Sequence, residues 1–132
     1  MLVIPGIVKL LLMPVVLITI IYLLLYRTMW FKKNVKRKNP KLYFGLHVFL
    51  CAASLVLMLM HVYTKLPFFA MISIWMKLTG VLMLVLFIIQ AVIGIKIKTK
   101  PNKNLFKLHR QIPAVLLALF VFHAFIFKMM FF

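Results

Sequence analysis

Four histidines in this sequence have the type and the spacing for ligand chemistry. His47 and His61 are 14 residues apart, and the same interval separates His109 from His123. On an α-helix, 14 residues give a rise of about 21 Å and a rotation only about 40° short of whole turns. Each pair would therefore occupy one face of its helix, with one imidazole near each end. Because imidazole is a common ligand of iron, zinc and copper, the pattern predicts a metal or haem site.

The composition excludes several other chemistries. The chain has 17 Lys and Arg residues but no Asp or Glu. No carboxylate acid–base pair, carboxylate-ligated metal or Ser-His-Asp triad can be built from it alone. Cys51 is the only cysteine, which excludes an internal disulfide and a covalent CxxCH haem site.

The sequence is too apolar for a small water-soluble core. Its 132 residues are 67% hydrophobic, with a mean hydropathy of +1.17. A membrane span needs about 20 apolar residues. We predict one all-α transmembrane domain over residues 1–132, a four-helix bundle. The fourth helix has an alternative start near Asn104, whose side chain would cap it. The predicted spans are Ile4–Tyr26, Leu42–Tyr63, Phe68–Ile95 and Ile112–Phe127.

The basic residues predict the orientation of these spans. Thirteen of the 17 lie in two connections, residues 27–41 and 96–110; the others are Lys9, Lys65, Lys77 and Lys128. By the positive-inside rule both connections are cytoplasmic and both termini lie outside. We expect an integral protein of a bacterial or archaeal plasma membrane. The net charge of +17 is then explained by anionic membrane lipid, and we expect no nucleic-acid partner.

In this topology the second and fourth helices are parallel, so their histidines match in depth. His47 would face His109 near the inner surface, and His61 would face His123 near the outer surface. Two opposed imidazoles can ligate a haem iron from both sides. We therefore expect two haems b between these helices, with a zinc or copper site as the alternative. A single site of four histidines is excluded, because the members of each pair are about 21 Å apart along the helix.

Further residues fit this arrangement. Gly80 and Gly94, on the third helix, are also 14 residues apart. A missing side chain leaves room for a haem beside the helix, although close helix packing would also use glycine. Arg110 and Lys107 are candidates to pair with haem propionates, and a position among lipid headgroups is the alternative for such side chains.

His109 is the weakest predicted ligand because of its local sequence. Pro113 follows it by four residues and has no N–H for the His109 carbonyl, so a helix break is expected there. Gln90, inside the third helix, could form a hydrogen bond to a neighbouring helix or to a ligand, and we expect the first.

The histidine and glycine spacings resemble the di-haem bundle of cytochrome b in the quinol–cytochrome c oxidoreductase. That family has a second glycine-bearing helix, which would correspond to the first helix here, where only Gly6 is present. The topology is also similar to the transmembrane core of ferric reductases and NADPH oxidases. His109-Arg110, His123 and the basic loop KKNVKRKNPK carry that second likeness. Both resemblances imply a four-helix bundle that holds two haems b.

The leading hypothesis is transmembrane electron transfer between the cytoplasmic and outer faces, with a redox partner protein or a quinone. A small membrane reductase that uses the outer haem edge on ferric iron, oxygen or quinone is an alternative. A self-contained quinol oxidase is disfavoured because the usual carboxylate proton acceptors are absent. A non-redox subunit of a larger membrane complex and a designed haem-binding membrane bundle are the remaining hypotheses.

Overall fold

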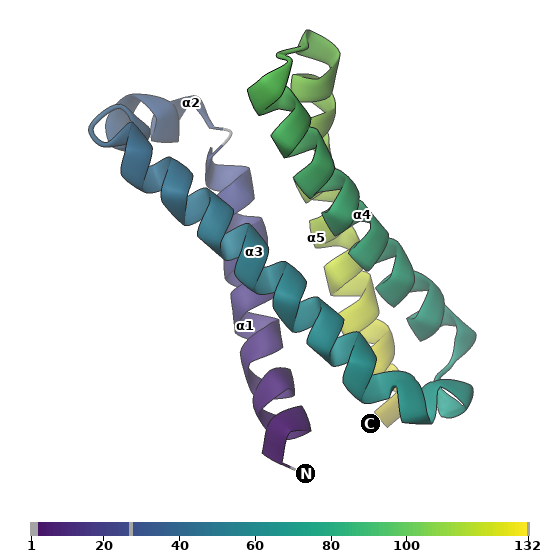
Figure 1. Ribbon diagram of the computed structural model, residues 1–132. Helices are drawn as coiled ribbons and strands as arrows, with labels where there is room; N and C mark the ends of the chain where they lie inside the picture. The colour runs from purple at the N-terminus through teal and green to yellow at the C-terminus, as the bar shows by residue number, and fades with distance from the viewer. Residues whose placement is uncertain (1–2, 27, 132) are drawn as a thin grey trace. The chain divides into compact units, whose positions relative to one another are not determined.

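The structure, a computed structural model, describes residues 3–26 and 28–131, without the side chains of residues 3–5, 9, 36, 127, 128, 130 and 131. Arg27 and the side chains of Lys9, Lys36 and Lys128, which contribute to the charge pattern, lie outside the described residues. The described residues are helical almost throughout (Figure 1). The elements are α1 (Val3–Tyr26), α2 (Met29–Phe31), a π-helical turn (Lys32–Lys36), α3 (Pro40–Lys65), a 3-10 helix (Leu66–Met71), α4 (Ile74–Thr99) and α5 (Lys103–Phe131).

Four of these helices are long and apolar enough to cross a membrane, which confirms the predicted all-α class with four candidate spans. The segments with this property are Gly6–Tyr26, Pro40–Met71, Ile74–Thr99 and Lys103–Ile126. Large apolar side chains are exposed on all four helices, as lipid-facing positions require.

Two predicted helix starts differ from the structure. The third long helix begins at Ile74 instead of Phe68, because the Ser73 hydroxyl accepts a hydrogen bond from the Met76 N–H (3.3 Å) and caps the helix there. The fourth begins at Lys103, well before Ile112, which confirms the alternative start near Asn104. Its cap is the Asn102 side chain, which accepts from the Asn104 N–H (2.8 Å); the predicted cap, Asn104, is the donor.

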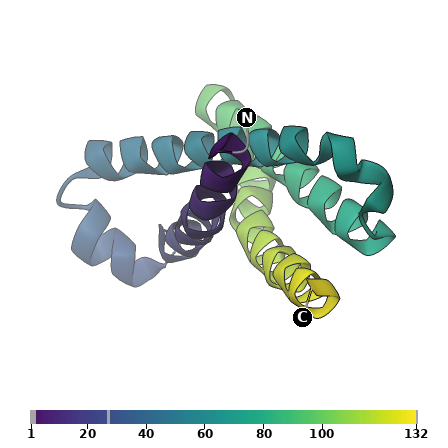
Figure 2. The same ribbon diagram turned by 90° about the horizontal axis from the view of Figure 1, so that it is seen from below.

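The described chain falls into two compact units, Met1–His61 and Val62–Phe132, and each is described by itself. In the N-terminal unit α1 and α3 cross (Figure 2). Their contact is polar: Thr19 Oγ1 lies 2.7 Å from Ser54 Oγ and 3.3 Å from the Leu50 carbonyl oxygen. Both side chains are fully buried. A buried hydroxyl pair of this kind joins helices where apolar surface alone gives little driving force in lipid.

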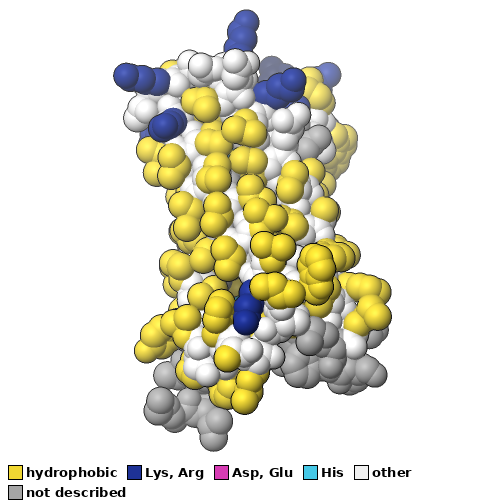
Figure 3. All heavy atoms as spheres, turned by 90° about the vertical axis from the view of Figure 1, so that its right-hand side faces the viewer, with side chains coloured by type: hydrophobic (Ala, Val, Ile, Leu, Met, Phe, Trp, Pro, Cys, Tyr) yellow, Lys and Arg dark blue, Asp and Glu magenta, His cyan; other side chains and the backbone are white. Residues whose placement is uncertain are grey.

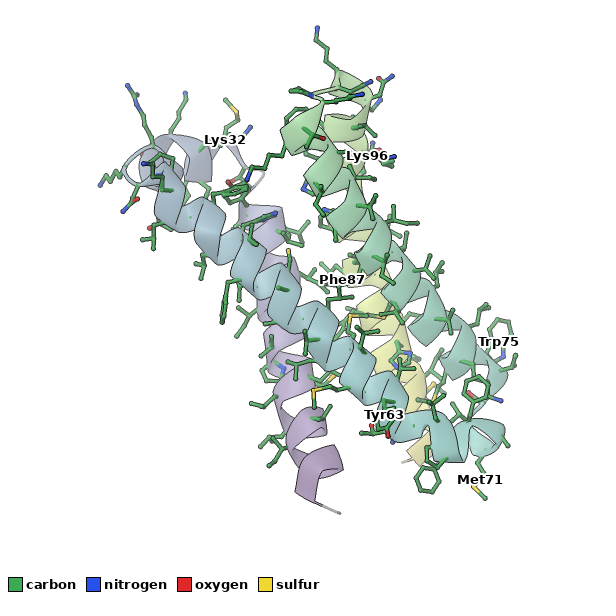
Figure 4. The ribbon with its side chains drawn as sticks, in the orientation of Figure 1. Lys32, Tyr63, Met71, Trp75, Phe87 and Lys96 are labelled. Carbon is green, nitrogen blue, oxygen red and sulfur yellow. The ribbon has the colours of Figure 1, made fainter. Side chains whose placement is uncertain are left out.

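In the C-terminal unit α4 and α5 pack against each other as an antiparallel hairpin (Figure 1). One face of α4 is buried at a helical period and contains Thr79, Met83, Phe87, Gln90 and Ile93. Figure 4 shows Trp75 near the start of α4 and Lys96 near its end. On the side of the molecule drawn in Figure 3, hydrophobic side chains cover most of the length and Lys or Arg side chains gather mainly at one end. The hairpin therefore has an apolar body and a basic end at its connecting loop.

Candidate functional site

Each predicted pair of histidines lies on one uninterrupted helix. His47 and His61 are on α3, and His109 and His123 are on α5. The α-helix of α5 continues through Pro113, so the expected break next to His109 is wrong. The predicted combinations of His47 with His109 and of His61 with His123 join the two units and stay predictions.

At one end of the hairpin, His123 is held by two consecutive residues of α4. Its ring Nδ1 lies 2.8 Å from Thr79 Oγ1. The next residue, Gly80, faces the same ring, and a Cβ added to it would lie 3.5 Å from His123 Cε1. The imidazole therefore lies against α4 at this glycine, where an added Cβ would be at an ordinary contact distance, and the threonine makes a polar contact with the ring.

At the other end, Gly94 faces His109 in the same way. A Cβ added to Gly94 would lie 3.2 Å from His109 Cε1, closer than the usual separation of carbon atoms in contact. The two glycines predicted from their spacing thus each meet an α5 histidine that shares that spacing. What they adjoin in the structure is an imidazole, and their role toward a haem macrocycle stays a prediction.

Gln90 explains how α5 continues through Pro113. Its Nε2 donates a 2.8 Å hydrogen bond to the carbonyl oxygen of His109. Pro113 has no N–H to donate to this oxygen, as an ordinary residue in its place would. Gln90 is buried, with 4% of its surface exposed. The predicted hydrogen bond from Gln90 to a neighbouring helix is confirmed, and its acceptor is the main-chain atom that the proline left open.

His47 lies among aromatic rings in the N-terminal unit. Its ring centroid is 5.1 Å from that of Tyr26, 6.4 Å from that of Phe44 and 6.5 Å from that of Tyr22. The Tyr22 hydroxyl donates to the Tyr43 carbonyl oxygen at 2.6 Å, which connects α1 to the start of α3. These rings restrict the orientation of His47 by packing.

Lys107 and Arg110, the candidate propionate partners, are exposed on the first turns of α5 next to His109. Thr79 and the rings around His47 were not anticipated from the sequence. The available signal for Thr79 was its polar side chain within an apolar span, directly before Gly80.

In the described part of the chain, no three His, Cys, Asp or Glu side chains form a group that could hold a metal ion. No match was found in comparisons with protein-family models, with curated proteins and with solved structures.

Proposed function

We propose that this chain is a membrane cytochrome b that transfers electrons between the two membrane faces. His47 and His109 would hold one haem b, and His61 and His123 the other. The observation that carries the proposal is the repeated arrangement in the α4–α5 hairpin. At both depths an imidazole of α5 rests on a glycine of α4, and both the histidines and the glycines are 14 residues apart.

The residues meet the chemical demands of bis-histidine ligation. Polar groups inside a membrane are costly, and their presence at regular depths favours a function over chance. Both members of each 14-residue pair are on one uninterrupted helix. Each imidazole would offer a nitrogen lone pair to the haem iron.

When bound, haem b supplies reversible one-electron chemistry. The chain's own residues would hold it and control its surroundings. The histidines would offer imidazole lone pairs to the iron, and the apolar helices would exclude water. Lys107 and Arg110, exposed beside His109, offer positive charge to propionates at that end. The positive-inside rule supports a cytoplasmic location for the basic connections.

Absorption spectroscopy of the purified protein tests the proposal. Protein expressed with added haem should show reduced haem b bands and about two haems per chain. The variant His61→Gln/His123→Gln should retain about half of that absorbance, and a variant with all four histidines changed to Gln should retain none. Helicity by circular dichroism is the control for folding. If the wild-type protein, supplied with haem, lacks these bands, the proposal is rejected.

Proteoliposomes test electron transfer across the membrane. With a reductant on one side and ferricyanide on the other, the wild-type protein should reduce the ferricyanide and the four-histidine variant should not. Equal rates for the two proteins would contradict the proposal. Rapid reoxidation of the reduced protein by oxygen, a ferric chelate or a quinone would identify it as a reductase that acts at one haem edge.

A further inference from the structure

Thr79 has three close polar neighbours, and its single hydroxyl proton cannot serve them all. Thr79 Oγ1 lies 2.8 Å from the Trp75 carbonyl oxygen, 3.3 Å from the Met76 carbonyl oxygen and 2.8 Å from His123 Nδ1. The residue is buried, with 5% of its surface exposed. These distances restrict where the proton can lie.

The two carbonyl oxygens can only accept a hydrogen bond, whereas an imidazole nitrogen can either donate or accept. A threonine inside a helix commonly donates to the carbonyl four residues earlier, which is Trp75 here. With its proton on that bond, Thr79 Oγ1 has only lone pairs to offer to His123. The Nδ1 atom of His123 must then carry the hydrogen, and in the neutral ring Nε2 carries a lone pair.

We propose that Thr79 is a positioning residue that holds His123 in the Nδ1–H tautomer, with Nε2 as the ligand atom. The inference rests on the proposed function, because it assigns which nitrogen of His123 meets the iron. Gly80, the next residue of α4, adjoins the same ring, and a Cβ added to it would lie at an ordinary contact distance of 3.5 Å from His123 Cε1.

The bond has two consequences for ligation. It orients the ring before ligand binding, so less side-chain freedom is lost when iron binds. It also increases electron density at the ligand nitrogen, because the second ring nitrogen donates a hydrogen bond. A more electron-rich ligand favours ferric iron, so the bond would lower the midpoint potential of a haem bound here.

The first test needs no haem. Full-length protein with 15N-labelled histidine is prepared haem-free in detergent micelles, and 15N NMR reports the tautomer of each ring. The His123 signal, assigned with His123→Gln, should be that of Nδ1–H in wild type and in Thr79→Ser. In Thr79→Val the tautomer population should shift toward Nε2–H. Thr99→Val is the matched control, since Thr99 is an exposed α4 residue whose hydroxyl bonds only to its own helix, at Ile95 and Lys96, among the described contacts.

The second test uses haem-loaded protein and a redox titration. Thr79→Val should raise the midpoint potential of the haem that His123→Gln eliminates, and should weaken haem binding about tenfold. Thr79→Ser, which keeps the hydroxyl, and the control Thr99→Val should both have the midpoint potential and haem affinity of wild type. Thr79→Ala is a second variant without the hydroxyl, for use if Thr79→Val has reduced helicity. The positioning role is overturned if the hydroxyl-free variants have the wild-type tautomer and potential.

The two tests separate this inference from the proposed function. A chain that takes up no haem but keeps the Nδ1–H tautomer in a Thr79-dependent way rejects the cytochrome and retains the hydrogen bond. A chain that takes up two haems, with a tautomer independent of Thr79, retains the cytochrome and rejects the positioning role.

Discussion

The two ends of the α4–α5 hairpin hold their histidines in different ways. His123 is bound at its ring, through Nδ1 and Thr79 Oγ1. His109 is bound at its main chain, where Gln90 donates to the carbonyl oxygen. The rings also differ in how closely they meet glycine, at 3.5 Å for Gly80 and 3.2 Å for Gly94, measured from an added Cβ.

The difference follows from the local sequence of each end. Near His109 the proline leaves a carbonyl that must find a donor within an apolar span, so the polar partner serves the backbone. Near His123 the chain has no such proline, and the polar residue of α4 meets the ring. One hairpin thus uses a polar residue in one place to complete a helix and in the other to orient an imidazole.

The largest expected effect comes from replacing the histidines one at a time. In the proposed cytochrome, His109→Gln and His123→Gln should each reduce the haem content from about two to about one per chain, because each removes one proposed ligand of the iron. The haem that remains in each variant gives the midpoint potential of the opposite end. A redox titration followed by visible absorbance measures both. Full haem content in either variant would show that the replaced histidine is not a ligand.

The free energy of unfolding of the haem-free protein should show that Gln90 acts on the main chain of His109. Gln90→Leu should destabilise the protein by about 1–2 kcal/mol, because it leaves the part-buried His109 carbonyl without this donor. In a Pro113→Ala background the loss should be smaller by about 1 kcal/mol, since alanine at that position would restore the N–H for the His109 carbonyl. Unfolding in SDS, followed by circular dichroism, measures the free energies.

Gln111→Leu is the matched control for the Gln90 and Pro113 variants. It is the same substitution of glutamine by leucine, but at an exposed position of α5. A loss from Gln90→Leu that is equal in both backgrounds would contradict the link between Gln90 and the proline.

The smallest expected effect distinguishes the two glycines. Glycine in a helix interior costs about 1 kcal/mol relative to alanine, so Gly80→Ala should raise the melting temperature. Gly94→Ala should gain less by about 0.5–1 kcal/mol, because its Cβ would press on the His109 ring. Gly45→Ala is the control for helix propensity alone, since nothing lies within 4 Å of its added Cβ. Equal melting temperatures for Gly80→Ala and Gly94→Ala would show that the ring moves away freely.

Much of the secondary structure was predictable from the sequence, whereas helix starts were less so. Long apolar runs correctly indicated four candidate spans. The start at Phe68 failed because hydrophobicity continues through a 3-10 helix that ends before the Ser73 cap. The start at Ile112 failed because the first two turns of α5 are polar and hydrophobicity does not report them. The asparagine capping signal gave the better start near Asn104, one residue from the observed Lys103, although the capping side chain is that of Asn102. Hydrophobicity reports burial in lipid and says little about where a backbone turn is capped.

In the candidate site, too, some features could be predicted from the sequence and others could not. The spacing of His109 and His123 follows from covalent geometry, because an uninterrupted α-helix fixes rise and rotation per residue whatever packs beside it. The match of Gly80 and Gly94 to these histidines was also visible as an equal interval in the sequence. Thr79 and Gln90 could be recognised as polar residues in a span, but not by the atoms they contact.

The sequence by itself therefore determined the number of membrane-length helices, the spacing of the histidines along them and the basic connections. Only the tertiary structure decided that Thr79 meets an imidazole and that Gln90 meets a backbone carbonyl. The physical reason is that a helix apolar on nearly every side has no pronounced face to set its rotation against a neighbour. Close packing at small residues and a few hydrogen bonds set that rotation, and these depend on both helices at once.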